Sequence, residues 1–422
     1  MNILVIGSGG REHALAYKLS QSNKVNHVFV APGNAGTALE AKISNINLRK
    51  IDELIDFAKN NSIEFTVVGP EAPLALGIVD KFRENGLKIW GPTQFCAQLE
   101  SSKAFAKQFM QDNHIPTAKY QVFSDFNLAK TYLEAQNFPI VIKADGLASG
   151  KGVLVAQSLN EAIDFTSQIF IENKFGQDAK VVIEEFIDGI EASFIVMVDG
   201  KNIVAMATSQ DHKRLLNDDL GPNTGGMGAY SPAPIVTPEL HQKIMEQVIS
   251  PVINGMNKLG HSYTGFLYAG LMIDNKQNIS TLEFNCRFGD PETQPIMLRL
   301  GSDLVELIEA GLNQKLDQVA AKWNPNFALG VVIATSGYPD SPKIGDIIHG
   351  LDSKFSDQIK VYHSGTKMIE GNICSSGGRV LCVTALGSDL AKAKQNAYTA
   401  IKLISFNGMQ YRTDIGNKEL IK

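Results

Sequence analysis

Residues 139–157 read PIVIKADGLASGKGVLVAQ, two short apolar runs separated by a glycine-rich turn. Each run has the length and β-branched composition of a strand, and strands joined by a short Gly-rich connection are typically antiparallel. The same pattern recurs in KVVIEEF (180–186) and ASFIVMVDG (192–200), which we expect to pair in the same way. The stretch from Tyr120 to Asp199 is therefore predicted to be an α+β unit of paired strands.

The sequence before this unit has a different pattern, in which short apolar runs alternate with helical segments and end in Gly or Pro. Strands alternating with helices predict a parallel, doubly wound sheet of the Rossmann type, whose ligand lies at the carboxyl ends of the strands. The apolar runs are Ile3–Ile6, Val28–Val30, Phe65–Val68 and Leu87–Trp90, and the helices between them include Glu12–Leu19 and Ile51–Asn60.

The sequence after the paired strands carries long polar loops and the apolar runs GFLYAGLMID (265–274) and STLEFNCRF (280–288). A helix at Lys103–Asn113 precedes the paired strands, and Lys322–Pro325 reads as a linker to a small α/β end domain. We therefore predict a multidomain α/β and α+β protein. Its expected parts are an N-terminal Rossmann-like domain at 1–102, a central domain at 103–322 with a subdomain at about 120–190, and a C-terminal domain at 323–422.

Composition restricts the class of protein. A 422-residue chain with 44% hydrophobic and 20% charged residues can form a large core, which excludes a disordered protein. The formal net charge of −5 comes without a long basic run, which argues against a nucleic-acid surface. No stretch reaches the roughly 20 apolar residues that span a bilayer, and the N-terminus reads as a strand, not a signal peptide. The four cysteines lack metal-binding spacing and indicate reduced thiols in a cytoplasmic protein.

The motif GSGGREHAL (7–15) follows the first expected strand. Its glycines allow a tight turn, and the next helix offers free N–H groups and its positive end to an anion. A dinucleotide fingerprint needs a third glycine where Glu12 stands, so NAD is not expected. Arg11 favours a sugar phosphate, although a structural turn with a solvated arginine explains the motif equally well.

The turn KADGLASGKGV (143–153) is not a P-loop, because its glycines have the wrong spacing, Gly152 replaces the Ser or Thr, and a strand follows. What remains is a hairpin with Lys151 at its tip and Lys143 on the strand before it. Gly-rich backbone can close over phosphates, and a lysine on a strand supplies a fixed charge. A surface hairpin with a stray lysine is the alternative.

The segment LEFNCRFGDPETQ (282–294) places Glu283, Asn285 and Arg287 at alternate positions of a strand, so their side chains share one face. An acid, an amide and a guanidinium together suit a Mg²⁺ ion beside an anion, because Mg²⁺ takes few protein oxygens. A solvent-facing polar edge is the alternative, but the flanking Leu282 and Phe284 indicate that the strand packs on a core.

Two further segments carry weaker signals. IEEFIDGIEASF (183–194) could present backbone to an adenine edge and the Glu191 carboxylate to ribose hydroxyls, or could hold solvated acids. The loop from Thr208 to Pro234 is long, and loops of this length are functional or disordered. Its His212 could act as a base, but a structural or solvated histidine is the preferred interpretation.

All these motifs occur together and in order: GSGGREHALA, KADGLASGKGV, EEF–DG–EAS, QDHKR, GPNTGGMGAYSP and LEFNCRFGDPETQPI. The chain thereby resembles, from residue 1 to about 390, the glycinamide ribonucleotide synthetase (phosphoribosylamine–glycine ligase) family of the ATP-grasp superfamily. The resemblance implies a Rossmann-like N-terminal domain, an ATP-grasp core with a lid, and a C-terminal domain resembling that of biotin carboxylase. It implies that ATP, glycine and 5-phosphoribosylamine give glycinamide ribonucleotide, ADP and phosphate in de novo purine (IMP) biosynthesis.

The resemblance also implies a site. Arg287 and Lys143 are expected to stabilise charge during catalysis, and Glu283 and Asn285 to hold Mg²⁺ or Mn²⁺. The expected ATP-binding residues are Lys103, Lys143, Gly146, Ser149, Gly150, Lys151, Gly152, Glu184, Glu185, Phe186, Ile187 and Glu191. The expected substrate-binding residues are Gly9, Gly10, Arg11, Glu12, Gly69, Pro70, Glu71, Asp211, Lys213, Gly225, Gly226, Arg287 and Asp290.

The sequence departs from the superfamily at one place. Many ATP-grasp enzymes carry a further acid on the strand before the metal pair, where this chain has Leu271 and Met272. The expected partners are small molecules only, without nucleic acid or membrane, and the expected assembly is a monomer or weak homodimer. Another ATP-grasp carboxylate–amine ligase and a non-catalytic ATP-binding module are the alternative functions.

Overall fold

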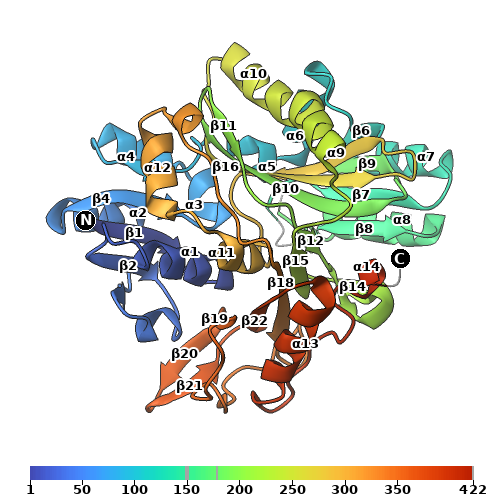
Figure 1. Cartoon of the computed structure of the whole chain (residues 1–422). Helices are drawn as coiled ribbons and strands as arrows, with labels where there is room; N and C mark the ends of the chain where they lie inside the picture. The colour runs from blue at the N-terminus through green and yellow to red at the C-terminus, as the bar shows by residue number, and fades with distance from the viewer. Residues whose placement is uncertain (148–151, 177–178, 421–422) are drawn as a thin grey trace.

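The computed structural model describes residues 1–147, 152–176 and 179–420. The chain forms a parallel N-terminal sheet, a central core sheet, a lid sheet and a C-terminal sheet. Figure 1 shows the N-terminal sheet at the left, the lid at the right and the C-terminal sheet below, with the core sheet between them. Within the described ranges, no helix is long and apolar enough to cross a membrane.

The N-terminal sheet has the predicted doubly wound form, with every neighbouring pair of strands parallel. Its strand order, β3-β2-β1-β4-β5, brings the loops after β1 and β4 together at one edge. The short β3 was not predicted from the sequence. The strands are β1 (Asn2–Gly7), β2 (His27–Pro32), β3 (Ile43–Asn45), β4 (Ile63–Val68) and β5 (Ile89–Trp90), and the helices are α1 (Gly10–Ser20), α2 (Ile51–Asn60), α3 (Glu71–Ala75) and α4 (Ile78–Glu84).

The lid sheet is antiparallel and has its own small core, which includes Ile142 and Ile183. The predicted pairing across the glycine-rich turn is confirmed, since Ile140 faces Ala156 and Lys143 faces Val153. The strands lie in the order β6 (Tyr120–Phe123), β9 (Val181–Glu185), β7 (Ile140–Ala144) and β8 (Val153–Ala156), with helices α7 (Phe126–Glu134) and α8 (Leu159–Phe170) packed together.

The predicted pairing of the second two strands is wrong, because they belong to different sheets. Strand β9 lies between β6 and β7 in the lid, so both its edges are already paired. The next strand, β10 (Ile190–Asp199), instead pairs along its whole length with β16 (Thr264–Ile273) in the core sheet. A Cβ on Gly189, where the chain enters the core sheet, would lie 2.5 Å from the Ile273 carbonyl oxygen. The four residues after β9 therefore connect lid to core instead of turning back.

The C-terminal sheet takes two strands from the long loop of residues 208–234. These are β12 (Gln210–Asp211) and β15 (Gly228–Ser231), and β15 pairs with β18 (Phe327–Ala334). The end domain predicted from residue 323 onward is thus completed by strands more than ninety residues earlier. The other strands of this sheet are β22 (Arg379–Gly387) and β19 (Ile359–His363), and the core sheet is completed by β11 (Ile203–Ala205) and β17 (Ile279–Asn285).

Short hairpins and helices fill the remaining chain. The hairpins are β13 (Arg214–Leu216) with β14 (Leu220–Asn223) and β20 (Thr366–Ile369) with β21 (Asn372–Ser375). The helices are α5 (Gln98–Ser101), α6 (Lys103–Asp112), α9 (Pro238–Ile244), α10 (Ser250–Lys258), α11 (Thr293–Arg299), α12 (Leu304–Leu312), α13 (Leu390–Ile401) and α14 (Asn417–Leu420).

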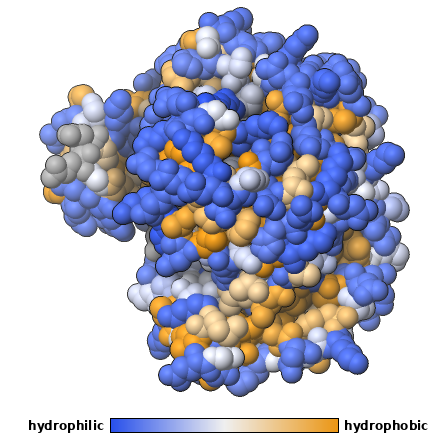
Figure 2. All heavy atoms as spheres, turned by 90° about the vertical axis from the view of Figure 1, so that its left-hand side faces the viewer, coloured by the Kyte–Doolittle hydropathy of each residue, from blue (hydrophilic) through white to orange (hydrophobic). Residues whose placement is uncertain are grey.

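An ion cluster joins the N-terminal and C-terminal domains. The Glu40 carboxylate is 3.1 Å from His13 Nε2 and 2.5 Å from Lys360 Nζ, and these groups border a cavity of about 560 Å³. Burial lowers the pKa of His13, so its ring is a neutral hydrogen-bonding partner. Figure 2 shows the left-hand side of the molecule in Figure 1. This face is largely hydrophilic, with apolar side chains gathered in its lower part, over the C-terminal domain. The exposed Ile347 and Met368 belong to that domain.

The junction between the N-terminal sheet and the core depends on Trp90 at the end of β5. Its ring is buried and meets Phe266 of β16 edge-on, with 5.8 Å between ring centroids. Helix α12 crosses the other side, where a Cβ on Gly311 would lie 2.3 Å from the indole ring. Glycine at this position therefore lets the helix approach the sheet.

We expect Gly311→Ala to destabilise the protein, although alanine in place of a helical glycine ordinarily stabilises by about 0.5–1 kcal/mol. The added methyl group would overlap a buried ring that cannot move aside, at a cost of about 1–3 kcal/mol. Urea unfolding measures the change. The neighbouring Ala310→Gly variant is the control, because it carries the ordinary helix cost without the overlap. A Gly311→Ala protein as stable as the wild type would contradict this packing.

Candidate active site

A cluster of buried charges lies where the lid meets the core. Glu184, on lid strand β9, is 3% exposed, and each of its carboxylate oxygens contacts a lysine ammonium group. Lys143 comes from the neighbouring strand β7, and Lys107 comes from helix α6. Lys107 Nζ also donates to Thr117 Oγ1 at 2.7 Å. One buried carboxylate is therefore shared by two lysines.

The charged groups of this cluster shift the pKa values of Glu184 and Lys107. Burial alone favours the neutral acid, but Lys143 and Lys107 outweigh it and lower the pKa of Glu184. Burial, reinforced by the charge of Lys143, lowers the pKa of Lys107 to about 8. At neutral pH the cluster thus carries two cations and one anion. This excess positive charge in a water-poor setting favours a polyanion such as a triphosphate.

Lys143 also ties the lid to the core sheet, because its Nζ donates to the Leu282 carbonyl oxygen at 3.1 Å. Leu282 is the extra residue of a β-bulge in β17, where the partner register shifts between Gly270 and Leu271. Bulges change the direction of side chains along a strand. After this bulge the alternation predicted from the sequence holds, with Phe284 buried and Glu283 and Asn285 on the open face.

The open face of β17 suits a divalent cation. Although burial opposes it, the charges of Lys213, Lys143 and Lys103 lower the pKa of Glu283 to about 2, so its carboxylate is ionised. In the part of the chain that the structure describes, Asn285 makes no side-chain hydrogen bond, and no group of three or more His, Cys, Asp or Glu could hold a metal by itself. Two oxygen ligands beside a cluster of lysines fit Mg²⁺, because Mg²⁺ takes few protein oxygens and completes its shell with phosphate oxygens and water.

Leu271 and Met272 lie on the strand beside this face. Strand β16 pairs with β17 through Leu271 opposite Thr281 and Met272 opposite Ser280. Leu271 is fully buried in the core. The strand next to β17 therefore carries apolar residues at these two positions.

Lys213 of the long loop completes the arrangement on this face. Its Nζ contacts the Glu191 carboxylate and lies 3.7 Å from Glu283 Oε1. Burial acts in the opposite direction, but these two acids raise the pKa of Lys213 well above its usual value. The nearby Asp211 has a raised pKa because it is buried and faces Glu292. The structure thus brings together Glu191, Asp211, Lys213 and Glu283 from three separate motifs.

A second network surrounds Arg287, just beyond β17. Its guanidinium is 2.7 Å from Glu100 Oε1 and 3.3 Å from Glu71 Oε2. Burial raises the pKa of Glu100 to about 7, whereas Arg287 and Arg11 outweigh burial and lower that of Glu71 to about 2. Glu100 was not among the residues expected from the sequence, because a lone acid on a short helix gives no signal.

Arg11 is engaged within the protein. Its Nε lies 2.6 Å from Glu12 Oε1, and its Nη1 donates to the Phe288 carbonyl at 3.2 Å. Glu12 also accepts from the Gly9 amide at 2.6 Å and fills the space beside Gly69, where a Cβ would lie 2.2 Å from its carboxylate. The helix start that the sequence suggested for an anion is thus partly satisfied by the chain's own acid. The phosphate-binding role of Arg11 stays a prediction.

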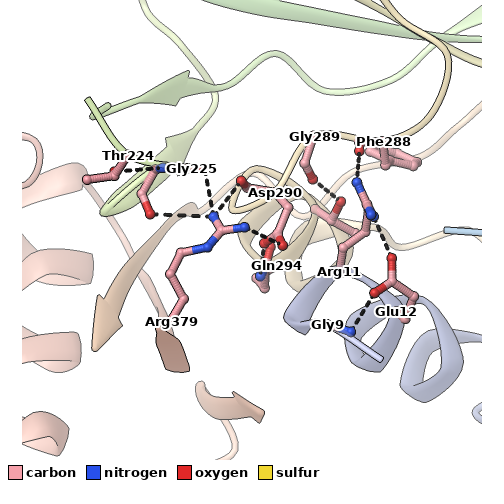
Figure 3. A network of polar contacts seen from close by, with 12 residues as sticks. Gly9, Arg11, Glu12, Thr224, Gly225, Phe288, Gly289, Asp290, Gln294 and Arg379 are labelled. Atoms are coloured by element: carbon pink, nitrogen blue, oxygen red, sulfur yellow. Dashed lines mark hydrogen bonds and ion pairs between the residues drawn. The ribbon is translucent and has the colours of Figure 1, made fainter. Parts of the chain in front are cut away.

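Arg379 of the C-terminal sheet reaches the same region from the other side. Figure 3 shows Arg379 and Arg11 on opposite sides of the Phe288–Asp290 loop, with Asp290 turned toward Arg379. Arg379 Nη2 lies 2.9 Å from Asp290 Oδ2, and its Nη1 donates to Gly225 O at 2.6 Å. It therefore holds together two loops expected to bind substrate. The sequence analysis missed Arg379, although the Gly377–Gly378 pair before it marks an unusual strand start.

The remaining expected ATP-binding residues divide into three groups. Lys103 donates to the Gly146 carbonyl at 2.8 Å, and Gly152 accepts from the Ala144 amide at 2.7 Å, so both ends of the glycine-rich turn are placed. Glu185, the last residue of β9, and Phe186, the first residue of the crossing from lid to core, are exposed, and Ile187 is half-buried. Ser149, Gly150 and Lys151 lie outside the described residues.

His212 is not positioned to act as a general base. It is buried, and its Nε2 accepts a hydrogen bond from the Gly416 amide at 3.2 Å. Burial, together with the charge of Arg412, lowers the pKa of His212 to about 4. These contacts agree with the preference for a structural histidine.

The sequence analysis also missed Lys107, although it lies four residues after Lys103 and hence on the same face of α6.

Comparison with known families covers almost the whole chain. The N domain, the ATP-grasp (A) domain and the C domain of phosphoribosylglycinamide synthetase match residues 1–100, 101–293 and 328–418. The chain belongs to the phosphoribosylglycinamide synthetase family. It is 60% identical to the phosphoribosylamine–glycine ligase of Neisseria meningitidis serogroup B over all of both chains, and 56% identical to that of Vibrio parahaemolyticus over all of this chain and 99% of the relative.

Solved structures agree with this membership. The crystal structure of phosphoribosylamine–glycine ligase from Thermotoga maritima superposes with a TM-score of 0.85 at 33% identity, covering 99% of this chain and 100% of that chain. Biotin carboxylase from Campylobacter jejuni has a TM-score of 0.75 at 15% identity, covering 100% of this chain and 95% of that chain. The second likeness shows a shared fold, as the sequence resemblance implied.

The lysine cluster allows a test of its energetics. We expect Glu184→Gln to destabilise the protein by about 3–5 kcal/mol, because it leaves two buried ammonium groups without a counter-charge. Adding Lys107→Met should restore part of this loss by removing one of the unpaired cations. Urea unfolding of both single variants and the double variant at pH 7 measures the coupling. Strictly additive effects would show that the two residues do not share a charge balance.

Proposed function

We propose that this protein is a phosphoribosylamine–glycine ligase of de novo purine (IMP) biosynthesis. It joins glycine to 5-phosphoribosylamine through glycyl phosphate and releases glycinamide ribonucleotide, ADP and phosphate. One observation carries this proposal beyond family membership. Lysines from the lid (Lys143), helix α6 (Lys103 and Lys107) and the long loop (Lys213) converge around the ionised Glu283.

The proposed ATP site lies between the lid sheet and the core sheet. We assign the phosphates to Lys103 and Lys143, together with Gly146, Ser149, Gly150, Lys151 and Gly152 of the glycine-rich turn. The adenosine is assigned to the end of β9, the crossing from lid to core and the strand beyond it. The residues of that segment are Glu184, Glu185, Phe186, Ile187 and Glu191. The exposed Phe186 supports this assignment, because an apolar side chain left open beside a polar site suits a base.

The proposed reaction depends on charge neutralisation. A glycine carboxylate oxygen attacks the γ-phosphorus of ATP, and the bond to the bridging oxygen breaks as ADP leaves. Lys143 and Arg287 stabilise the negative charge on the transferring group. Glu283 and Asn285 would hold Mg²⁺ or Mn²⁺, which would supply further neutralisation of the phosphate charge. In-line phosphoryl transfer needs little covalent assistance, so positioning by these residues accounts for the step.

The second step is attack by the amine of 5-phosphoribosylamine on the acyl carbon, with phosphate as leaving group. A neutral amine needs no strong base, and the contact of His212 with the Gly416 amide leaves that ring outside the chemistry. We assign the substrates to the loops that meet around Arg287. The assigned residues are Gly9, Gly10, Arg11, Glu12, Gly69, Pro70, Glu71, Asp211, Lys213, Gly225, Gly226, Arg287 and Asp290.

The proposal extends to assembly and location. We propose domains at 1–102, 103–322 with a lid at about 120–190, and 323–422, acting as a monomer or weak homodimer. All four cysteines are free and buried, which supports a reducing compartment such as the cytoplasm.

The lid has a role in the proposed reaction, because it protects the reactive acyl phosphate from water.

We expect Glu283→Gln to abolish turnover while the protein remains folded. The amide keeps the shape of the side chain but loses the charge that Mg²⁺ requires. The measurement is ADP release across a Mg²⁺ titration, with circular dichroism as the check on folding. Ser280→Ala, at the start of the same strand, is the control. Near-normal activity of Glu283→Gln at low Mg²⁺ would remove Glu283 from the metal site.

The substrate assignment has a direct test. We expect ADP release to require both glycine and 5-phosphoribosylamine, and mass spectrometry to identify glycinamide ribonucleotide. Release with a different acid or amine, but not with this pair, would indicate another carboxylate–amine ligase. ATP binding without turnover under any of these conditions would indicate a non-catalytic module.

A further inference from the structure

A short segment near the C-terminus lies across the long loop that enters the active site. We call residues Arg412–Gly416 the C-terminal strap. Figure 1 shows the chain end and α14 beside β14, far in sequence from the loop they accompany. The strap faces the β13–β14 hairpin, which follows directly after Lys213. None of the motifs that indicate the ligase family includes the strap.

Arg412, the first residue of the strap, makes several of its hydrogen bonds. It is a large side chain that is only 1% exposed. Its Nη1 donates to Arg214 O at 3.1 Å and to Asp219 Oδ1 at 2.7 Å, both in the hairpin. Its Nε and Nη2 donate to the two carboxylate oxygens of Asp414 at 2.8 and 2.7 Å. A bidentate pair of this kind fixes the orientation of the guanidinium.

The neighbouring residues of the strap add bonds to the tip of the hairpin. The Asn217 side-chain amide donates to Thr413 Oγ1 at 2.7 Å and accepts from the Thr413 amide at 2.9 Å. The Asp218 amide donates to Asp414 Oδ2 at 2.8 Å. A two-stranded hairpin is marginally stable alone. The strap therefore supplies the contacts that hold this one in a single position.

The last contact of the strap reaches the residue between two site residues. The Gly416 amide donates to His212 Nε2, and His212 stands between Asp211 and Lys213. The backbone around Lys213 is fixed as well, since the Thr224 amide donates to its carbonyl at 2.8 Å. From this backbone the Lys213 side chain extends to Glu191 and Glu283. A shift of the loop would therefore move the Lys213 ammonium group.

The other side of the strap is anchored in the C-terminal core. Ile415 is fully buried, and its amide donates to the hydroxyl of Tyr398 on α13 at 3.3 Å. The same hydroxyl donates to the Arg412 carbonyl at 2.7 Å. The strap thus links a packed helix to the active-site loop. The strap therefore packs against its own domain through Ile415 and, in addition, makes hydrogen bonds to the loop.

We propose that Arg412 and the C-terminal strap are positioning elements of the ligase, which hold the Asp211–Lys213 segment so that Lys213 faces Glu283. Arg412 acts through the loop and touches no substrate. This proposal rests on the proposed role of Lys213 in the active site. It gives the C-terminal domain an indirect part in the reaction, by positioning the active-site loop through the strap as well as through Arg379.

The main test is Arg412→Gln, compared with Asn396→Ala as a matched control. The control removes a 2.8 Å hydrogen bond from α13 to Leu386 O in the same domain but no contact with the loop. We expect Arg412→Gln to speed hydrogen exchange of the His212, Thr224 and Met227 amides, well below the unfolding temperature. We expect kcat/KM to fall about tenfold or more, because misplacement of about 1 Å can cost that much. The control should change neither quantity.

A surface variant covers the case in which Arg412→Gln does not fold. Asn217 is exposed, so Asn217→Ala removes two strap contacts without opening the core. We expect faster exchange of the same amides and a loss of about two- to fivefold in kcat/KM. Exchange and kcat/KM equal to those of the control, in whichever of the two variants folds, would overturn the positioning role.

A third variant separates this proposal from the proposed active site. Lys213→Met should lower turnover strongly while leaving exchange of the loop amides unchanged. If Lys213→Met keeps full activity, Lys213 is not part of the site and the positioning proposal is overturned with it. If Lys213→Met is inactive but Arg412→Gln behaves like the control, the active site stands and only the strap proposal fails.

Discussion

The buried carboxylate of Glu184 is the interaction on which the arrangement of the site depends. It lies in a lid strand, between a lysine of the same sheet and a lysine of α6. A buried carboxylate stays ionised only if nearby cations compensate its charge. Lys107 and Lys143 together compensate it and leave the cluster with one net positive charge. Because Lys143 also bonds the Leu282 carbonyl of β17, the same charge balance ties the lid to the core sheet. The proposed ATP site and the root of the lid therefore share one set of residues.

The long loop of residues 208–234 connects the proposed site to the C-terminal domain. It gives β12 and β15 to the C-terminal sheet and carries Lys213 to the open face of β17. Two arginines of the C-terminal domain, Arg379 and Arg412, bond the loop at separate places. The C-terminal domain is thus part of the site's framework. Biotin carboxylase shares this fold at 15% identity.

Sequence reasoning succeeded where the deciding physics is local. Strand β7, the glycine-rich turn and β8 were predicted as a hairpin because a short turn leaves the chain no other partner. The shared face of Glu283 and Asn285 followed from the two-residue period of a strand, and it survives because the bulge at Leu282 lies before them. The same reasoning failed for β9 and β10, where nearness in sequence was taken for pairing. Both edges of β9 were already occupied by strands from elsewhere in the lid.

The sequence by itself determined the class of the fold, the order of its motifs and the family to which they belong, because each motif is a contiguous run whose turn or strand chemistry can be read locally. Only the tertiary structure decided which charges meet. Glu184 could not be recognised as buried, nor Lys107 as its partner, until β9, β7 and α6 were packed together. The same holds for Arg412, which bonds Asp219 almost two hundred residues away. Pairing between distant charges depends on burial and on long-range strand order, and neither is encoded in the spacing of neighbouring residues.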